Sequence, residues 1–364
     1  MLRVATVNVN GIRAAHRRGF GTWLAARDPD IVALQEVRCP VAALPDGAFG
    51  GYHAAYDPGR FAGRNGVAIL TRMPPAAARA WDVSVQIGRP VRSGAGPDPS
   101  VEEPLGPGDA TDADGGPGDA TDADGGPGDA DGGPRAAYTW EPRTVERDRA
   151  LPRELRRFAD HGRYLEVDLA DLPLTVASLY LPKGGLPAHL QRPGSTREPP
   201  DGGHRFDRKV AFLRGFARGV TAARRAARGR GRDYLLMGDF NIAHGPLDVA
   251  NWRRQVRVEG FLPEERAWMD EIVGPRRLVD VVRSVNPHVQ GPYSWWSWLP
   301  GCFDRDTGWR IDLHLATAPL ARAALAAGTD RAPDADSRMS DHAPVVVDYD
   351  VQRWLSDRAS RGEG

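Results

Sequence analysis

A carboxylate and a carboxamide stand two residues apart at the end of an apolar run, where they could move a proton and hold a ligand. Asp239 and Asn241 follow residues 234–237, whose sequence YLLM is typical of a buried strand. Side chains alternate along a strand, so these two are expected to point the same way. Open α/β sheets bind ligands beyond the carboxyl ends of their strands. The segment therefore marks a candidate reaction centre.

Several other strand-like runs also end in, or contain, a polar residue. These residues are Asn8, Glu36, Tyr180, Asp312, Asp341 and His342. If they share one site, both halves of the chain must reach it, and residues 1–355 then form a single catalytic domain. A length of 364 residues alone would suggest roughly two domains, but the shared site favours one.

The residue types at these strand ends suit hydrolysis of a phosphodiester by an activated water. The oxygen donors belong to Asn8, Glu36, Asp239 and Asp341. Such hard donors favour Mg²⁺ or Mn²⁺ over Zn²⁺, and either ion can neutralise a phosphate. His342 beside Asp312 would be held in one tautomer and favoured as a cation, and Tyr180 adds a phenol. Taken singly, each residue is more often structural, so the hypothesis rests on their joint occurrence.

The remaining patterns predict the elements that must position these groups. Apolar residues recur every three or four positions from Phe206 to Val220, which predicts an amphipathic helix. Its basic end, residues 224–232, is interpreted as a solvated helix end rather than a nucleic-acid patch. A second helix is expected to start near Pro263. Strands are expected at 4–7, 31–34, 52–56, 67–70, 164–169, 174–179, 279–282, 293–298, 311–316 and 345–349, with a frayed tail at 356–364.

The formal net charge of zero conceals an uneven distribution. Residues 94–134 hold eleven acids and no Lys or Arg, and the ten-residue unit GPGDATDADG occurs twice in them. Taking those eleven acids from 48 leaves 37, against 48 basic residues in the rest of the chain. We expect a disordered, low-complexity insertion here, with a calcium loop as the weaker alternative because no distal Glu follows. The basic remainder suits a polyanionic partner.

Other features of the composition narrow the class of protein. Cys39 and Cys302 are the only cysteines, which excludes a disulfide framework or a cysteine metal site. No run approaches about 18 consecutive apolar residues, so no membrane partner is expected. A strand pattern begins at once at the first residues, with no signal peptide before it. The sequence predicts a cytoplasmic protein.

Seven segments, in order along nearly the whole chain, carry a family resemblance. They are residues 6–13 (TVNVNGIR), 34–36 (LQE), 66–69 (GVAI), 237–242 (MGDFNI), 261–270 (FLPEERAWMD), 310–312 (RID) and 340–344 (SDHAP). The chain resembles the exodeoxyribonuclease III branch of AP endonucleases, within the endonuclease/exonuclease/phosphatase superfamily that includes deoxyribonuclease I. The resemblance implies a four-layered α/β sandwich of two packed, mainly antiparallel sheets flanked by helices.

The same resemblance implies roles for the strand-end residues. It implies Mg²⁺, with Mn²⁺ as a substitute, bound through Glu36, with Asn8 and Asp341 in or beside the metal shell. Asp239 would activate or orient the attacking water, and Asn241 would position it or the phosphate. The further implied roles are transition-state stabilisation for His342 backed by Asp312, contact with a phosphate oxygen for Tyr180, and a DNA-backbone contact for Arg163.

The segment 293–298 (YSWWSW) matches a part of the family that lines the pocket for an extrahelical abasic sugar. This match implies that Trp295, and with less support Trp296, stacks or wedges at the DNA lesion. Lys183 stands where the family commonly has an amide or a hydroxyl, and it could add a phosphate contact or disturb the site. The insertion at 94–134 falls where the family has a short connection.

The resemblance leads to a specific functional expectation. The chain is expected to be a monomeric, Mg²⁺-dependent DNA repair nuclease acting on double-stranded DNA. It would cut 5′ to abasic sites and remove nucleotides or blocking groups from 3′ ends. The alternatives are a nonspecific endonuclease or phosphoesterase of the same superfamily, or a catalytically silent DNA-binding relative.

Overall fold

Two β-sheets and the helices that flank them make up the described part of this computed structural model, which covers residues 1–61, 63–82, 84–91, 138–145, 150–192 and 199–362. The first sheet contains Leu2–Asn8 (β1), Ile31–Gln35 (β2), His53–Asp57 (β3), Val67–Thr71 (β4), Ser84–Pro90 (β6), Tyr138–Thr144 (β7), Ala324–Thr329 (β13) and Val345–Tyr349 (β14). The second contains Ala77–Ala80 (β5), Tyr164–Asp168 (β8), Leu174–Tyr180 (β9), Asp233–Asp239 (β10), Val279–Asp280 (β11) and Asp312–Ala316 (β12). The helices are Ile12–Arg17 (α1), Phe20–Arg27 (α2), His204–Gly229 (α3), Trp252–Gln255 (α4), Pro263–Ile272 (α5), Val281–Val285 (α6), Ala318–Arg322 (α7) and Val351–Ala359 (α8).

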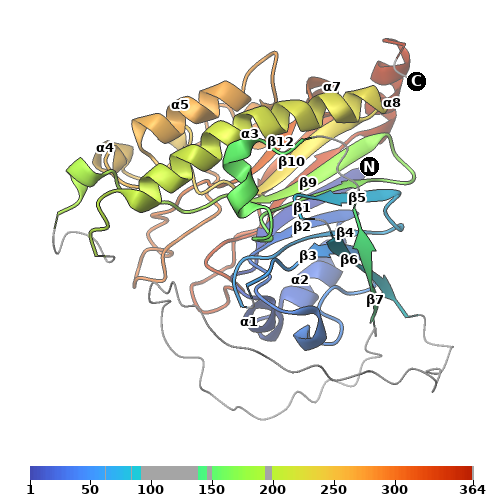
Figure 1. The fold of residues 1–364 in the computed structure, drawn as a ribbon, viewed down its shortest axis with the longest axis horizontal. Helices are drawn as coiled ribbons and strands as arrows, with labels where there is room; N and C mark the ends of the chain where they lie inside the picture. Colours follow the sequence, from blue (N-terminus) through green and yellow to red (C-terminus); the bar gives the residue numbers. More distant parts are fainter. Residues whose placement is uncertain (62, 83, 92–137, 146–149, 193–198, 363–364) are drawn as a thin grey trace.

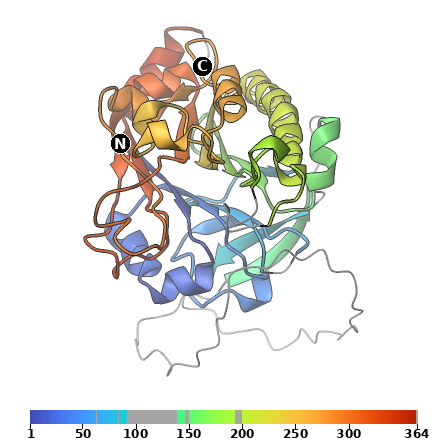
Figure 2. The same cartoon turned by 90° about the vertical axis from the view of Figure 1, so that its left-hand side faces the viewer.

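The two sheets pack face to face, with helices on their outer faces (Figure 1; Figure 2). The strand orders are β13-β14-β1-β2-β4-β3-β6-β7 and β11-β12-β10-β9-β8-β5. Only the β1–β2 and β9–β10 pairs are parallel, and the other pairs are antiparallel. This arrangement confirms the predicted four-layered α/β sandwich of two mainly antiparallel sheets.

Three apolar clusters hold the four layers together. Val4, Met237 and Val345 belong to the cluster between the sheets. Phe212 on α3 belongs to the cluster that joins α3 and α5 to the second sheet, and Phe20 on α2 belongs to the one that joins α1 and α2 to the first. Burial of apolar side chains at about 25 cal/mol per Å² is the main force that keeps these layers in contact.

Polar side chains also cross the interface between the sheets. The Gln35 side-chain amide donates to Ser178 Oγ at 3.0 Å, and that hydroxyl donates to the Leu34 carbonyl at 3.0 Å. Nε2 of the buried His314 lies 3.2 Å from the Val345 carbonyl oxygen. Buried polar groups with such partners fix one relative position of two surfaces, because any slip would leave them unsatisfied.

The strand register brings the polar strand ends to one edge of the sandwich. In the first sheet Asn8 is opposite Gln35, directly before Glu36. In the second sheet Asp239 lies between Tyr180 on β9 and Asp312 on β12. Because the two sheets are packed together, the two rows of polar groups face one another at this edge. Pairing between strands that are far apart in sequence is therefore what assembles the site.

Two predicted strands are wrong. Residues 293–298 form no strand, and Trp295 makes only isolated bridges to Trp309 and His342. Residues 279–282 split into the short β11 and the start of α6, because the Asp280 carboxylate accepts from the Arg283 amide at 3.0 Å and caps the helix.

The predicted frayed tail at 356–364 is also wrong over its described part. Helix α8 continues to Ala359, and its Trp354 is fully buried. The Trp354 indole N–H and an Arg358 guanidinium N–H each donate to Asp233 Oδ2 at 2.8 Å. These bonds and the buried ring attach the end of the chain to the start of β10. The whole insertion predicted at 94–134 lies outside the described residues, as do residues 363–364.

No helix in the described ranges combines the length and the apolar character that crossing a bilayer requires.

The structure also contains strands that the sequence patterns did not predict, namely β5, β6, β7 and β13.

Gly238 generates a prediction about the centre of the fold. Its φ is +137°, and a Cβ added there would lie 2.0 Å from the Leu179 carbonyl oxygen on the paired strand. Gly238→Ala should lower the free energy of unfolding by roughly 3 kcal/mol or more, because overpacking and backbone strain add. Urea denaturation followed by circular dichroism measures this loss.

The matched control is Gly229→Ala at the end of α3, where an added Cβ meets nothing within 4 Å. That change should be neutral or stabilising by up to about 1 kcal/mol. Equal effects of the two substitutions would contradict the packing argument.

Candidate active site

Asp239 is the centre of a hydrogen-bonded group that joins the two sheets. The side-chain amide of Asn8 donates to Asp239 Oδ2 at 2.9 Å and to Glu36 Oε1 at 2.8 Å. Asn241 donates its backbone N–H to Asp239 Oδ1 at 2.8 Å and its side-chain amide to Oδ2 at 3.1 Å. Asp239 is only 1% exposed. The predicted pair Asp239 and Asn241 is therefore in direct contact, and Asn8 connects it to Glu36.

His342 and Asp312 form the predicted imidazole–carboxylate couple. Nδ1 of His342 lies 2.8 Å from Asp312 Oδ2, and its Nε2 lies 4.0 Å from Asp239 Oδ2. Burial alone would lower the pKa of His342, but the charges of Asp312, Asp239 and Asp341 outweigh it and raise that pKa to about 10. His342 is therefore a cation at neutral pH, and it presents a positive group beside Asp239.

The pKa of Asp239 is raised to about 7, chiefly because burial disfavours its charged form. His342 opposes this shift, whereas Asp312 and Glu36 add to it. A carboxyl group whose pKa lies near the working pH can both accept and release a proton. The geometry and the pKa of Asp239 thus fit a group that takes a proton from water.

The backbone around the site is also unusual. Asn10, Glu36, Arg38 and Asn241 have φ values of +44°, +51°, +52° and +48°. This left-handed region is uncommon for residues other than glycine, and it costs free energy where no local bond repays it. Such conformations cluster at functional sites, where the surrounding structure holds them in place.

Three side chains in the described part of the chain could together hold a metal ion. They are Glu36, Asp239 and His342, whose carboxylate oxygens and ring nitrogen lie within 4.8 Å of one another. The buried Glu36 carboxylate already faces a cation, since the Arg38 guanidinium donates to its Oε2. Two hard carboxylates fit Mg²⁺ or Mn²⁺, whereas a protonated His342 has no lone pair to offer. Glu36 and Asp239 thus fit a divalent cation better than the His342 nitrogen does.

Asp341, a predicted member of the metal shell, is held by nitrogen donors on both oxygens. Asn10 donates its side-chain amide to Oδ1 at 2.9 Å, and the Trp295 indole N–H donates to Oδ2 at 3.0 Å. The Asn10 backbone N–H in turn donates to Asn8 Oδ1 at 3.0 Å. Asp341 thus borders the group around Asn8 and connects it to the indole ring of Trp295.

Tyr180 and Arg163 lie together on the other side of Asp239. The Arg163 guanidinium carbon is 4.9 Å from the centre of the Tyr180 ring, and Nη1 donates to the Tyr180 carbonyl at 3.2 Å. Burial, with the charge of Glu36, raises the pKa of Tyr180 well above its usual value, so the phenol stays protonated. Arg163 is 8% exposed and stacks on this ring, and its predicted contact with the DNA backbone stays a prediction.

The other residues predicted to contact the substrate differ in how exposed their side chains are. Lys183 is exposed at the rim, with Nζ 3.5 Å from Glu259 Oε1. Trp295 is half-buried beside Asp341, as a pocket role requires. Trp296 is 1% exposed and packs against Phe303, so the prediction that its ring stacks at a lesion is wrong.

The sequence analysis missed Trp309, which completes the aromatic rim. Trp309 lies edge-to-face with Trp295 at 6.4 Å between ring centres, and the backbones of the two residues form a bridge. The signal was present in the sequence, because Trp309 directly precedes the matched residues 310–312. It was overlooked because the partner segment 293–298 was interpreted as a strand of its own.

No sequence pattern predicted the two buried cations that pair with carboxylates behind the site. Lys209 on α3 lies 2.6 Å from Glu265 Oε1 and donates to the Asn241 carbonyl at 3.0 Å. Arg310, next to Trp309, donates to Asp248 at 2.8 Å and to Asp280 at 2.7 and 3.0 Å. These pairs hold the loops that carry Asn241 and Trp309, since a broken buried pair would leave an uncompensated charge.

Comparison with known proteins defines the class to which this fold and site belong. Residues 5–342 match the model of the Endonuclease/Exonuclease/phosphatase family, and the chain belongs to that family. An exodeoxyribonuclease of Bacillus subtilis is 36% identical over 113 residues, which make up 31% of this chain and 43% of that protein. Exodeoxyribonuclease III of Haemophilus influenzae is 35% identical over 121 residues, 32% of this chain and 45% of that protein. The matched part thus spans less than half of these relatives.

Solved structures show the same fold over almost the whole chain. An AP endonuclease from Archaeoglobus fulgidus has a TM-score of 0.62 at 22% identity, with 96% of this chain and 100% of that chain covered. A 3′ phosphatase from Neisseria, bound to a product DNA hairpin, has a TM-score of 0.62 at 21% identity and the same coverage. These structures confirm the predicted fold, and the family match with the sequence relatives confirms the predicted resemblance to the exodeoxyribonuclease III branch of AP endonucleases.

The His342–Asp312 couple makes a prediction about proton binding. Asp312→Asn should lower the pKa of His342 from about 10 by at least one unit, because the carboxylate that outweighs burial is removed. The titration of the His342 imidazole nitrogens by NMR, in metal-free protein, measures this change.

His314 supplies an internal control in the same spectra, since burial alone lowers its pKa to about 4 and Asp312 is not among the causes. Its titration should be unchanged. A His342 pKa that stays near 10 in Asp312→Asn would show that the couple is not the cause.

Proposed function

We propose that this protein is a Mg²⁺-dependent DNA repair nuclease that hydrolyses phosphodiesters 5′ to abasic sites and removes nucleotides or blocking groups from DNA 3′ ends. The observation that carries the proposal is the group around Asp239, in which Asn8, Asn241 and His342 surround one buried carboxylate with a raised pKa. The family membership and the exodeoxyribonuclease relatives support the same class of reaction.

The side chains divide the work of in-line hydrolysis between them. Asp239 accepts a proton from the attacking water while Asn241 orients that water or the phosphate. The His342 cation, held by Asp312, stabilises the negative charge that develops on phosphate oxygens. Tyr180 keeps its proton and donates it in a hydrogen bond to a phosphate oxygen. Glu36, with Asn8 and Asp341 in or beside the shell, would hold Mg²⁺, or Mn²⁺ in its place, and that ion would supply positive charge to the phosphate and the leaving oxygen.

Glu36 is the principal metal ligand in this proposal, with Asn8 and Asp341 in or beside the shell. Burial of Glu36 and its contact with the Arg38 guanidinium support this role, because this carboxylate requires a nearby positive charge. A carboxylate oxygen of Asp239 lies within 4.8 Å of one from Glu36, which supports a place for Asp239 beside both the metal and the water.

The rim of the site supports a DNA substrate with a displaced nucleotide. Trp295 and Trp309 present two half-buried rings next to Asp341, which suits the apolar face of a base-free sugar. Lys183 is exposed at the rim, which supports a contact of its ammonium group with a phosphate of the DNA backbone. We further propose that the protein acts as a monomer in the cytoplasm, where the DNA substrate places it at the nucleoid.

An end-labelled duplex with one abasic site tests the proposal. With Mg²⁺ the protein should cut the labelled strand 5′ to the abasic site and shorten its 3′ end, and EDTA should stop both reactions. Product lengths on a denaturing gel measure the outcome. Equal cutting of intact duplex would favour a nonspecific endonuclease, and metal-independent cutting would contradict the metal scheme.

Asp239→Asn should reduce kcat by at least 10³-fold, since the group that accepts the proton is lost, while the affinity for the abasic duplex stays within a few-fold. The matched control is Asp270→Asn on α5, an exposed carboxylate outside the Asp239 group. Single-turnover rates and binding in EDTA separate the two effects. Retained activity in Asp239→Asn would remove this residue from the mechanism.

A further inference from the structure

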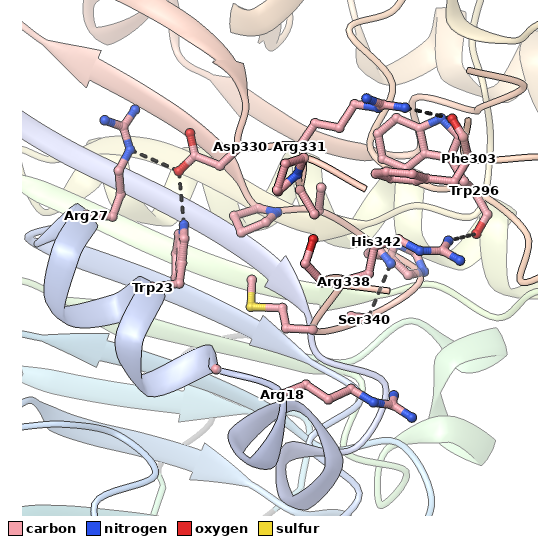
Figure 3. Close-up of a pocket in the computed structure, with 17 residues that line it drawn as sticks. Arg18, Trp23, Arg27, Trp296, Phe303, Asp330, Arg331, Arg338, Ser340 and His342 are labelled. Atoms are coloured by element: carbon pink, nitrogen blue, oxygen red, sulfur yellow. Dashed lines mark hydrogen bonds and ion pairs between the residues drawn. The ribbon is translucent and has the colours of Figure 1, made fainter. Parts of the chain in front are cut away.

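A cavity of about 460 Å³ adjoins the active site, and no step of the proposed reaction uses it (Figure 3). Its walls come from the junction of α1 and α2, from residues 330–333 and 337–344, and from the side chains of Trp296 and Phe303. Ser340 and His342 also contribute to it, so one short segment separates it from the Asp239 group. The volume is typical of sites for small ligands, which occupy roughly 300–1,000 Å³.

Three arginines that line this cavity stack on aromatic rings, one of which, Trp298, lies outside the lining. The Arg338 guanidinium lies 4.1 Å from the Trp298 ring centre and 4.7 Å from that of Phe303. Arg331 lies 4.0 Å from the Phe303 ring centre, and Arg18 lies 5.5 Å from that of Trp298. Stacking of this kind holds a guanidinium plane in place and leaves its N–H groups free to point elsewhere.

The charge inside the cavity is strongly positive. Four arginines and one acid line it, namely Arg18, Arg27, Arg331, Arg338 and Asp330. Asp330 is already engaged, because it lies 3.0 Å from Arg27 Nε and accepts from the Trp23 indole N–H at 3.0 Å. Figure 3 shows this pair at one end of the cavity, away from Arg331 and Arg338. At that second end Arg331 Nε lies 3.7 Å from Asp306 Oδ1, and the charges of Asp341 and Asp304 act on Arg338 without forming an ion pair with it in the described structure.

Arg338 is the most unusual of these groups because it is buried and no carboxylate of the described residues is in direct contact with it. It is 7% exposed, and its hydrogen bonds in the described structure go to the backbone carbonyls of Ala335 and Trp296, at 3.1 and 3.3 Å. No carboxylate of the described residues comes within 4.0 Å of it. A buried guanidinium needs a compensating anion, and one that lines a cavity can obtain it from a ligand.

The walls indicate what kind of anion fits. Beside the arginines stand the partly exposed apolar side chains of Trp23 and Met339. A small inorganic anion would leave those surfaces uncovered, whereas a planar aromatic group carrying a phosphate would use both features. Guanidinium groups bind phosphate through paired N–H donors, and bases stack on aromatic and arginine planes.

We propose that this cavity binds one nucleotide unit, with its phosphate on Arg338 and Arg331 and its base against the apolar walls. The inference rests on the proposed function, because a nuclease acting on DNA supplies such units in two ways. One source is a free nucleoside 5′-monophosphate, the product that removal of a 3′ nucleotide releases. The other is a nucleotide of the DNA strand that lies beside the active site.

Calorimetric titration of the full chain with deoxyadenosine 5′-monophosphate, in EDTA so that no turnover occurs, tests the proposal. Saturable binding of one molecule is expected, with at least tenfold weaker binding of deoxyadenosine and of inorganic phosphate. Arg338→Gln and Arg331→Gln should each weaken binding at least tenfold. Arg225→Gln, on the exposed face of α3, is the matched control and should bind as the wild type does.

Two further variants separate this site from the active site and from a folding defect. Asp239→Asn should keep nucleotide binding, whereas it loses cleavage, so the proposed function and the cavity can fail independently. Arg338→Lys keeps the charge but loses the paired donors, and it should show intermediate affinity with an unchanged Tm. Absence of saturable binding by the wild type, or equal binding by Arg338→Gln, would overturn the proposal.

The two sources are distinguished by the affinity for an abasic duplex, again in EDTA. If Arg338→Gln weakens binding of the abasic duplex, and the free nucleotide competes with that duplex for the wild type, the cavity holds a nucleotide of the DNA strand. Unchanged duplex affinity, together with the tenfold loss for the free nucleotide, assigns it to the released product.

Discussion

The burial of two carboxylates side by side is the constraint on which this site depends. Asp239 and Glu36 each offer an oxygen to one compact group, and neither is open to bulk water. In isolation, two such charges would be costly to bury, and the pKa of the more buried one rises accordingly. The structure offsets the cost with the Asn8 amide between them, His342 beside one and Arg38 beside the other.

This arrangement exists only if the two sheets keep their relative position. Asn8 is the last residue of β1 and Asp239 is the last residue of β10, so their hydrogen bond joins the two sheets. The bond between Gln35 and Ser178 fixes the same interface a short distance away. Behind the site, Lys209 on α3 holds the Asn241 loop by its carbonyl. Fold and chemistry are coupled here, because the contacts that align the sheets also place the reacting groups.

Much of this could be predicted from sequence, since strands are visible as apolar runs and their ends as changes to polar residues. Asp239, Asn241, Asn8 and Glu36 were found in this way, and the structure brings them into contact. The contact of His342 with Asp312 was predicted too, because each lies in a short motif close to a recognisable strand.

The errors concern side chains whose direction is set by irregular backbone. Trp296 is buried against Phe303, because loops do not follow the alternation of a strand. Trp309 was missed since its importance comes from a bridge to Trp295, and no local pattern shows which loops meet. The edge strands β7 and β13 were missed for a related reason, as their exposed residues carry no continuous apolar signal.

The central claim is that the paired carboxylates of Asp239 and Glu36 form a divalent-cation site at the reacting end of the sandwich. Titration of the full chain with Mn²⁺, followed by electron paramagnetic resonance of the free ion, tests it most directly. We predict saturable binding by the wild type and at least tenfold weaker binding by Glu36→Gln. The exposed Glu264→Gln variant on α5 should bind as the wild type does. Equal Mn²⁺ affinity of the wild type and Glu36→Gln would contradict the account.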